Sequence, residues 1–479
     1  MRAQSRFRRT KIVCTLGPKT SSPEMIRALI EHGMDVARLN FSHGDRDTHR
    51  QTIRAIRQAS AELKKEVGIL QDLGGPKIRL GTIAGNERVL EMREQVALVV
   101  GTESADPNVI PVNYAHLMED VRQGDRIMMA DGTVQLTVKE KNPEQLVCTV
   151  VVGGRIMSRK GINLPSSVLK VTALTEKDRQ DLLVGLEEGI DFVAMSFVRS
   201  EKDLYPVLWM MEQAEKRPML IAKIEKPQAV EGFNSILAEV DGVMVARGDL
   251  GVELPIEEVP IIQKQIIKAT RQAGKPVITA TQMLNSMQDN PRPTRAEATD
   301  VANAILDGTD ALMLSDETAV GAYPLDAVDT LDRIAHTTEP YLDGQKLLHE
   351  EKSDHLPSTA AAISRAACLL AYDLHAAAIV ACSSSGSTAR LVTRFRPSCP
   401  TIALTDHVET LRQLSLSWGV IPYMVDSFSD TDTMFASARN WAIDQGIASR
   451  NDRLIITAGV PVGVPGSTNL VKVMELSGS

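Results

Sequence analysis

The chain has 479 residues, of which 43% are hydrophobic and 24% are charged, and its formal net charge is −8. This length exceeds what one hydrophobic core usually supports, so we expect two to four domains. The mild acidity argues against a nucleic-acid-binding protein, which usually carries a basic face, but it is compatible with local sites for small phosphates.

Cysteine usage and hydropathy indicate the compartment. The five cysteines are scattered, and no two have the spacing of a metal site. We therefore expect reduced, mostly buried thiols in a cytoplasmic protein. The apolar run after the basic N-terminal residues is too short for a signal peptide, and no run of about 18 apolar residues predicts a membrane span.

The N-terminal part alternates between strand-like and helix-like segments. Strands are expected at 11–15, 36–41 and 67–70. Helices are expected between them, from Ser22-Pro23 to near Gly33 and from about 47 to 64, because Ser and Pro favour a helix start. This order is typical of a parallel sheet.

From residue 77 to about 170 the pattern changes to short segments with alternating polarity, separated by turn residues. Strands are expected at 88–90, 96–99, 126–129, 133–138 and 147–151. The interval 73–170 therefore predicts a small β-barrel domain that is inserted into the first domain.

The strand–helix alternation resumes with a helix from Thr175 to near Gly189. The strands that follow are expected at 192–195, 220–223, 243–246, 277–280 and 311–314. Three strands before the insertion and five after it predict an α/β fold with a (β/α)8 TIM barrel, formed by 1–72 and 171–342. A doubly wound open sheet is the alternative, although it normally has fewer strands.

A polar segment at 341–353 is expected to be a linker, and an Ala-rich helix follows from Ser358. Further strands are expected at 377–381, 401–404, 421–425 and 454–457. We therefore predict a separate C-terminal α/β domain over 343–479.

Polar side chains follow most of the predicted barrel strands, at the end where TIM barrels carry their active sites. They are Arg38, Asn40, Ser42, His43, Asp72, Lys77, Arg79, Ser196, Arg199, Lys223, Glu225, Arg247, Asp249, Thr281, Gln282, Ser315, Asp316 and Glu317. A single Arg near a strand end is as often part of a structural ion pair, and a single Glu at a rim is more often solvated. The joint placement at one rim favours a site for phosphate and metal.

The residue types suit that chemistry. Arg38 and Arg79 offer forked donors for phosphate oxygens. Glu225 and Asp249 offer the hard oxygen ligands that Mg²⁺ or Mn²⁺ prefers. Lys223 is placed to neutralise charge on a phosphoryl group in transfer.

The segment 248–251 turns towards a possible short helix, so the backbone N–H groups at Gly248 and Asp249 are candidates to hold a substrate carboxylate.

Eight sequence blocks occur in an order and at a spacing that resemble the pyruvate kinase family of bacterial type, over nearly the whole chain. They read TLGP, RLNFSHG, GPKIR, KGINLP, IAKIEK, MVARGDLGVE, ATQML and NPRPTRAE. The resemblance implies a catalytic barrel, a β lid and a C-terminal regulatory domain. It also implies the last step of glycolysis, in which phosphoenolpyruvate phosphorylates ADP to give pyruvate and ATP. The lid is expected to close over ADP and exclude water.

The resemblance assigns roles at the phosphoenolpyruvate half of the site. Glu225 and Asp249 would bind Mg²⁺ or Mn²⁺, and Lys223 would stabilise the phosphoryl group and the enolate oxygen. Thr281 would lie beside the face of the enolate that takes a proton, and Gly248 would help to hold the substrate carboxylate.

Other residues would contact phosphate and nucleotide. Arg38 and Arg79 would hold phosphate. Asn40, His43, Arg79 and Lys160 would contact ADP or ATP.

The proton would arrive through water and either Ser315 or Glu317. Asp316 stands where the family commonly has Gly, and Ser166 follows Leu164-Pro165 where Gly is usual.

A potassium site of the family is only partly present. Asn40, Ser42 and Asp72 match it, whereas Leu73 replaces a Thr and Lys77 replaces a Glu. We therefore expect the Lys77 ammonium to take the place of K⁺ and to make K⁺ dispensable.

The loop Ser383, Ser384, Ser385, Gly386, Ser387 and Thr388 resembles the family's phosphate-binding effector loop. The later loop 459–469 should cover this site, and it lacks the Trp and Arg that would grip fructose 1,6-bisphosphate. A sugar monophosphate or AMP is therefore the expected activator. The resemblance also implies a homotetramer.

Two alternatives remain: another barrel enzyme that uses phosphoenolpyruvate, such as a mutase or carboxylase, and a non-catalytic sensor of phosphorylated metabolites. The lid and KGINLP disfavour the first, because those reactions need no ADP. The intact Lys223, Glu225, Asp249 and Thr281 disfavour the second.

Overall fold

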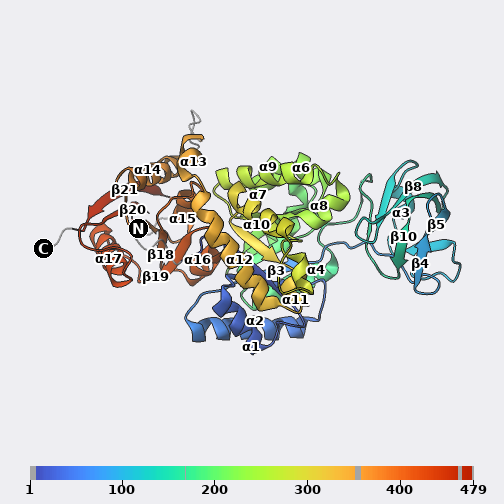
Figure 1. The fold of residues 1–479 in the computed structure, drawn as a ribbon, viewed down its shortest axis with the longest axis horizontal. Helices are drawn as coiled ribbons and strands as arrows, with labels where there is room; N and C mark the ends of the chain where they lie inside the picture. Colours follow the sequence, from blue (N-terminus) through green and yellow to red (C-terminus); the bar gives the residue numbers. More distant parts are fainter. Residues whose placement is uncertain (1–6, 168, 351–357, 462–466, 477–479) are drawn as a thin grey trace.

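The computed structural model describes residues 7–167, 169–350, 358–461 and 467–476. Three parts lie in a row along its longest axis (Figure 1): the C-terminal domain, the barrel, and the inserted domain at the opposite end.

The central part is a closed barrel of eight parallel strands. They are β1 (Lys11–Leu16), β2 (Val36–Asn40), β3 (Gly68–Leu73), β12 (Phe192–Met195), β13 (Met219–Ile224), β14 (Gly242–Ala246), β15 (Val277–Ala280) and β16 (Ala311–Leu314). Neighbours in the ring are neighbours among the barrel strands in the chain, and β16 closes onto β1. The predicted TIM barrel is confirmed, and the open sheet is excluded.

Burial explains why these strands are so apolar. Almost every position in them is buried, because helices cover the outside of the barrel and the strands' own side chains fill its inside. The barrel helices are α1 (Pro23–His32), α2 (Arg46–Leu63), α4 (Glu176–Glu187), α5 (Tyr205–Glu212), α6 (Pro227–Glu231), α7 (Phe233–Glu239), α8 (Arg247–Glu253), α9 (Val259–Gln272), α10 (Arg295–Asp307), α11 (Asp316–Ala319) and α12 (Pro324–Thr338). The predicted start of α1 is confirmed, since the Ser22 side chain accepts a hydrogen bond from the Met25 N–H.

The inserted domain has two sheets around one apolar core. Its elements are β4 (Glu87–Leu90), β5 (Gln95–Val100), β6 (Val109–Val112), α3 (Leu117–Asp120), β7 (Arg126–Met129), β8 (Val134–Lys141), β9 (Leu146–Val152), β10 (Gly154–Met157) and β11 (Ile162–Asn163). All five predicted strands are confirmed, and β6, β10 and β11 were not predicted. Because the insertion follows β3, the domain is attached at the carboxyl end of the barrel strands.

The C-terminal domain has a five-stranded sheet in the order β19-β18-β17-β20-β21. Its elements are α13 (Gly344–Glu350), α14 (Thr359–Asp373), β17 (Ala378–Cys382), α15 (Ser387–Thr393), β18 (Thr401–Thr405), α16 (Val408–Gln413), β19 (Val420–Met424), α17 (Thr431–Asp444), β20 (Arg453–Gly459) and β21 (Thr468–Glu475). The predicted linker at 341–353 was wrong over α13, because its Gln, Lys, Leu and Glu residues are good helix formers despite their polarity. The last strand, β21, was not predicted.

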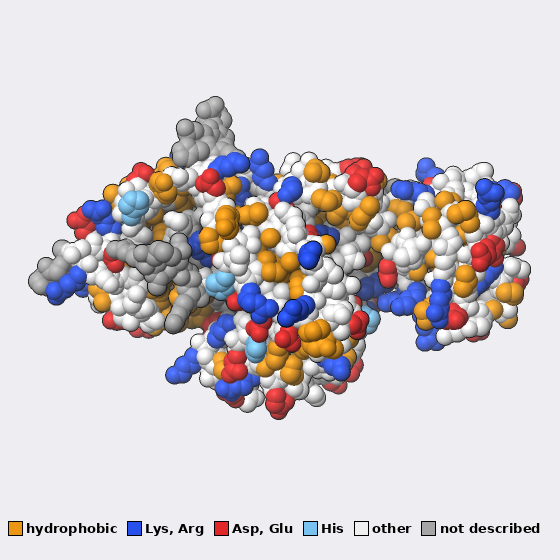
Figure 2. All heavy atoms as spheres, viewed as in Figure 1, with side chains coloured by type: hydrophobic (Ala, Val, Ile, Leu, Met, Phe, Trp, Pro, Cys, Tyr) orange, Lys and Arg blue, Asp and Glu red, His pale blue; other side chains and the backbone are white. Residues whose placement is uncertain are grey.

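Three observations bear on the expectations about membranes, nucleic acids and thiols. Among the described residues, no helix combines the length and apolarity that crossing a membrane requires. On the face in Figure 2, acidic and basic side chains are interspersed over the barrel. The five cysteines form no disulfide, and four of them are buried.

Candidate active site

Asp72, at the end of β3, is the centre of a buried charge network at the carboxyl end of the barrel. Its Oδ2 accepts hydrogen bonds from the Arg38 guanidinium, whose Nε and Nη2 lie 2.8 and 2.7 Å away. Its Oδ1 lies 3.3 Å from the Lys223 Nζ. Burial alone would raise the pKa of Asp72, but Lys223 and Arg38 bring it below the ordinary value. Asp72 is therefore an ionised carboxylate that orients both cations.

Lys223 lies on β13 with its ammonium held on three sides. Its Nζ donates to the Ser196 Oγ at 2.7 Å and lies 2.8 Å from the Glu225 Oε1, besides its contact with Asp72. Burial would lower the pKa of Lys223, but Asp72 and Glu225 outweigh it and raise the pKa above the ordinary value. The ammonium therefore stays charged and is fixed in position.

Glu225 and Asp249 follow adjacent strands, as the sequence predicted. Glu225 is buried, and its Oε2 accepts the Phe197 N–H at 2.9 Å. Burial raises the pKa of Glu225, Lys223 opposes this, and the Asp249 charge raises it further. Asp249 is exposed in the first turn of α8.

Two carboxylates that repel each other at an open rim suit a hard divalent cation. No group of three or more His, Cys, Asp or Glu side chains suited to a metal occurs in the described part of the chain. A metal at Glu225 and Asp249 would therefore need further ligands from water or substrate.

Thr281, after β15, has a strained backbone. Its φ is +68° and that of Gln282 is +54°, a region that β-branched residues rarely adopt. The Thr281 Oγ1 accepts the Gly248 N–H at 2.7 Å and donates to the Ala280 carbonyl at 2.6 Å. The Gly248 N–H, which the sequence suggests as a donor to a substrate carboxylate, is thus engaged by Thr281 in this structure.

The Glu317 carboxylate accepts backbone hydrogen bonds from the loops that follow β15 and β16. Its Oε1 accepts the Leu284 N–H at 3.0 Å, and its Oε2 accepts the Ser315 N–H at 2.7 Å. Burial raises the pKa of Glu317, although these hydrogen bonds oppose the shift. Asp316 is exposed and lies within electrostatic range of His43.

The residues expected to contact nucleotide lie at the rim or on the inserted domain. The Arg79 guanidinium donates to the Arg159 carbonyl at 3.0 Å, so it points to the inserted domain. His43 and Lys160 are exposed. Desolvation, followed by the charges of Lys77 and Arg79, lowers the pKa of His43. His43 is therefore the neutral member of this cationic group.

The potassium-type residues are arranged around the same rim. Ser42 N–H donates to the Asn40 Oδ1 at 3.1 Å, and Leu73 is buried. Desolvation and the charge of Lys223 lower the pKa of Lys77, while Asp72 raises it. No described residue accepts a hydrogen bond from the Lys77 ammonium, which lies on an exposed side chain. The structure thus brings Lys77 within range of Asp72 without a direct bond.

A second buried ion pair, which sequence reasoning missed, lies beside the two carboxylates. Lys226 Nζ lies 2.5 Å from the Glu253 Oε1 and 5.1 Å from the centroid of the Phe197 ring. The same Glu253 oxygen accepts from the Asn163 Nδ2 of the inserted domain at 2.9 Å. This pair therefore ties the inserted domain to α8, which carries Asp249. Its sequence signal was that Lys226, Glu253 and Asn163 each stand in one of the quoted blocks, IAKIEK, MVARGDLGVE and KGINLP.

The expected effector loop lies between β17 and α15, in the C-terminal domain. Gly386 has a φ of +74°, and Thr388 Oγ1 lies 2.6 Å from the Thr468 Oγ1. The Ser384 and Ser385 carbonyls accept from Thr410 Oγ1 and Arg390 Nη2, respectively. The loop that should cover it lies partly outside the described residues, at 462–466.

Comparisons with known proteins agree with this geometry. The family model "Pyruvate kinase, barrel domain" matches residues 7–328, and "Pyruvate kinase, alpha/beta domain" matches residues 361–474. The chain is 46% identical over 470 residues to pyruvate kinase 2 of Synechocystis sp., covering 97% of this chain and 79% of the relative. It is 45% identical over 470 residues to a pyruvate kinase of Mycobacterium tuberculosis, covering 98% of each.

A crystal structure of a pyruvate kinase from Cryptosporidium parvum superimposes with a TM-score of 0.92 at 36% identity, covering 98% of this chain and 96% of that chain. Together with the barrel site, these matches show that the chain belongs to the pyruvate kinase family and is a phosphotransferase.

Proposed function

We propose that the chain transfers the phosphoryl group of phosphoenolpyruvate to ADP, giving pyruvate and ATP. The observation that carries the proposal is the fixed, charged Lys223 ammonium between Asp72, Ser196 and Glu225. A preorganised cation at this place stabilises negative charge on the transferring phosphoryl group and on the enolate oxygen left behind. Arg38, fixed by Asp72, supplies further donors to phosphate.

Glu225 and Asp249 would hold the divalent metal, Mg²⁺ or Mn²⁺, and such an ion neutralises phosphate charge and polarises bound oxygens. Their mutual repulsion, which contributes to the raised pKa of Glu225, is the observation that favours a cation between them. The remaining coordination positions would be filled by substrate and water. The Glu225 carboxylate is kept in place by the Phe197 N–H.

The enolate then needs a proton, and we assign its delivery to the side lined by Thr281. The Thr281 Oγ1 accepts from Gly248, so a substrate carboxylate that takes over the Gly248 N–H would release this hydroxyl. Ser315 and Glu317 lie behind it as the proposed source of the proton. Both Glu317 oxygens accept backbone N–H groups, so its role includes positioning the loop.

The ADP half of the site is assigned to Asn40, His43, Arg79 and Lys160, with the inserted domain as a lid. We place the domain limits at 1–72 with 171–342, at 73–170 and at 343–479. The bond from Arg79 to Arg159 moves with the lid, so lid closure and Arg79 placement are coupled. Closure would exclude water and protect the phosphoryl group from hydrolysis.

We further propose that Lys77 makes K⁺ dispensable. Its charge lies within electrostatic range of Asp72, and Lys77 follows Leu73 closely in the chain. Equal rates in Na⁺ and K⁺ buffers are expected, whereas strict K⁺ dependence would contradict this part of the proposal.

Regulation is assigned to the loop 383–388, with a sugar monophosphate or AMP as activator of a cytoplasmic homotetramer. Support comes from the hydroxyl groups and the left-handed Gly386 of the loop. Rates measured with ribose 5-phosphate, glucose 6-phosphate, AMP and fructose 1,6-bisphosphate test the effector, and sedimentation tests the oligomer. No response to any of the four compounds would make the loop purely structural.

The main activity is tested by measuring pyruvate formed from phosphoenolpyruvate with Mg²⁺, with and without ADP. Lys223→Met is expected to lower kcat by roughly 10²–10³-fold, the cost typical of one lost transition-state donor. Pyruvate formation that does not depend on ADP, or an unaffected variant, would refute the proposal.

A further inference from the structure

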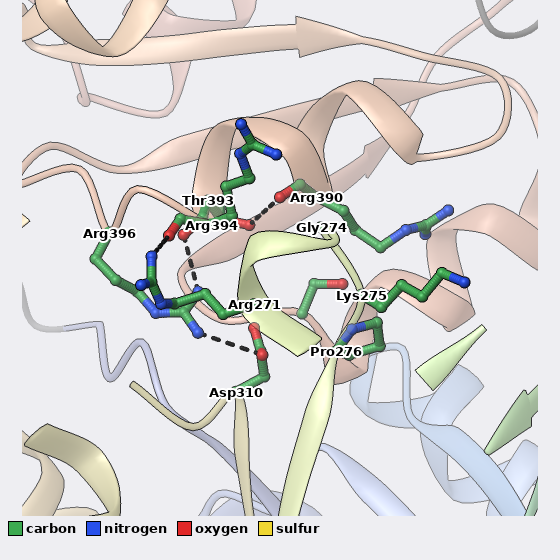
Figure 3. Close-up of a pocket in the computed structure, with 10 residues that line it drawn as sticks. Arg271, Gly274, Lys275, Pro276, Asp310, Arg390, Thr393, Arg394 and Arg396 are labelled. Carbon is green, nitrogen blue, oxygen red and sulfur yellow. Dashed lines mark hydrogen bonds and ion pairs between the residues drawn. The ribbon is translucent and has the colours of Figure 1, made fainter. Parts of the chain in front are cut away.

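The barrel is joined to its two neighbouring domains in different ways. Where the C-terminal domain packs on it, side chains bond directly across the contact, and Arg271 of the barrel donates to the Arg394 carbonyl at 2.7 Å (Figure 3). At the opposite end, the inserted domain is attached through the two chain segments that enter and leave it. A barrel residue, Phe197, contacts the entering segment and also bonds to the proposed metal ligand Glu225.

Phe197 follows β12 and has a strained backbone. Its φ is +58°, in the left-handed region that bulky residues rarely adopt. This conformation costs free energy for any residue with a Cβ, so it persists only where surrounding contacts enforce it. In this conformation the Phe197 N–H donates to the Glu225 Oε2 at 2.9 Å.

The Phe197 ring has contacts that can enforce the strained conformation. It packs on the backbone of Gly75, in the segment that leads from β3 into the inserted domain, since a Cβ on Gly75 would lie 2.7 Å from the ring Cδ2. The Lys226 ammonium lies 5.1 Å from the ring centroid, within the range of a cation–π contact. Lys226 is paired in turn with Glu253, which accepts from Asn163 of the inserted domain. The ring is therefore held by groups that belong to the inserted domain or are bonded to it.

The Phe197 N–H is one of two donors that fix the Glu225 carboxylate. The Lys223 ammonium lies 2.8 Å from the Oε1, and the Phe197 N–H lies 2.9 Å from the Oε2. Each oxygen keeps a further lone pair for a cation. Groups that orient a metal-binding side chain in this way raise the metal affinity. Loss of the Phe197 N–H would release the Oε2 and let the carboxylate turn.

We propose that Phe197 is a positioning residue for the metal site. Its packed ring keeps the backbone in the strained conformation, and this conformation directs the N–H that orients Glu225. The inference rests on the proposed function, because it takes Glu225 as a metal ligand. Since the ring packs on the segment that enters the lid, movement of the lid would reach Glu225 through Phe197.

Two substitutions that both remove the ring separate the backbone strain from the packing. Phe197→Gly keeps the N–H and adopts a positive φ at little cost, whereas Phe197→Ala bears that cost without the packing that enforces it. Mn²⁺ binding to the full chain without substrate is followed by the electron paramagnetic resonance signal of free Mn²⁺. We expect Phe197→Ala to bind Mn²⁺ roughly 10–100-fold more weakly than the wild type, the effect typical of removing a group that orients a metal ligand. Phe197→Gly should bind Mn²⁺ more tightly than Phe197→Ala.

A purely structural role predicts the reverse order, because Gly adds flexibility to a cavity that both variants share. Equal Mn²⁺ binding by Phe197→Ala and the wild type, or binding by Phe197→Gly that is no tighter than that of Phe197→Ala, would therefore overturn the inference. Asp249→Asn locates the ion and should lose most of the Mn²⁺ binding. Wild-type binding by Asp249→Asn would overturn the metal site of the proposed function and this inference with it. Loss in Asp249→Asn, with none in Phe197→Ala, would overturn the role of Phe197 alone.

A crystal structure of Phe197→Ala tests the geometry independently of affinity. The φ at position 197 is expected to become negative, and its N–H to move beyond hydrogen-bond distance of Glu225. A positive φ with an intact bond to Glu225 would overturn the inference. Thermal midpoints of both variants are measured first, and Mn²⁺ is titrated well below the lower midpoint, so that a loss of binding does not reflect unfolding.

Discussion

Replacing Glu253 by Gln should destabilise the barrel strongly, because it removes the charge partner of a buried lysine. The side chains of Lys226 and Glu253 are 8% and 1% exposed, and their charged atoms lie 2.5 Å apart. The amide keeps an oxygen that can accept from Asn163, so the change isolates the charge. Breaking a buried pair by removing one partner costs about 3–5 kcal/mol.

This cost corresponds to a large shift in melting temperature. In a domain of about 150–250 residues, about 1 kcal/mol lowers the midpoint by roughly 2–4 °C. We therefore expect the barrel transition of Glu253→Gln to fall by about 6–20 °C in differential scanning calorimetry at a fixed scan rate. The double variant Lys226→Met/Glu253→Leu should regain most of this loss, since apolar replacement of a whole buried pair is often neutral.

A matched surface pair provides the control. Arg27 and Glu31 are paired at 3.2 Å, but both side chains are about half exposed. Glu31→Gln should therefore cost only about 0.3–0.5 kcal/mol, because solvent screens the exposed pair. If Glu253→Gln lowered the midpoint no more than Glu31→Gln does, the assignment of a buried, uncompensated Lys226 would be refuted.

Three further predictions concern the lid, pH and the monovalent cation. Asn163→Ala removes the contact of the lid with Glu253, so steady-state kinetics should show a larger rise in KM for ADP than for phosphoenolpyruvate; equal rises would contradict a lid role. Folding lowers the pKa of Asp72 below its ordinary value of 3.8. The ionised carboxylate therefore stabilises the fold at any pH above 3.8, and this stabilisation is lost as the pH falls through the lower pKa of the folded state. Asp72→Asn should therefore melt lower than wild type at pH 7, and the difference should shrink towards pH 3; a constant difference would argue against the assignment. Lys77→Glu should make the enzyme faster in K⁺ buffer than in Na⁺ buffer. Equal rates of the variant in the two buffers would contradict the role of Lys77.

The sequence was informative where burial on both faces makes strands apolar. All eight barrel strands were predicted because each is a short, almost fully buried run before a polar strand end. Strand β11 has only two residues, β6 contains Pro111 and β10 begins at Gly154, and Pro and Gly are poor strand formers. The helix α13 was missed because polarity alone does not distinguish an exposed helix from a linker.

The candidate site was predictable in composition and less so in geometry. A parallel closed barrel brings all carboxyl strand ends together, which placed Asp72, Lys223 and Glu225 in contact. No local pattern indicates that Thr281 engages the Gly248 N–H, because that bond joins the ends of neighbouring strands. Such contacts depend on tertiary packing, and a single sequence does not record them.

The central claim is that Lys223 stabilises the charge that develops when phosphoenolpyruvate transfers its phosphoryl group to ADP. ³¹P NMR of phosphoenolpyruvate, ADP and Mg²⁺ with the full chain follows both sides of this transfer in one sample. The account predicts that the phosphoenolpyruvate signal is replaced by the γ-phosphate signal of ATP in equal amount, and that Lys223→Met slows this exchange roughly 10²–10³-fold. Release of free phosphate without ATP, or transfer at the wild-type rate in Lys223→Met, would contradict it.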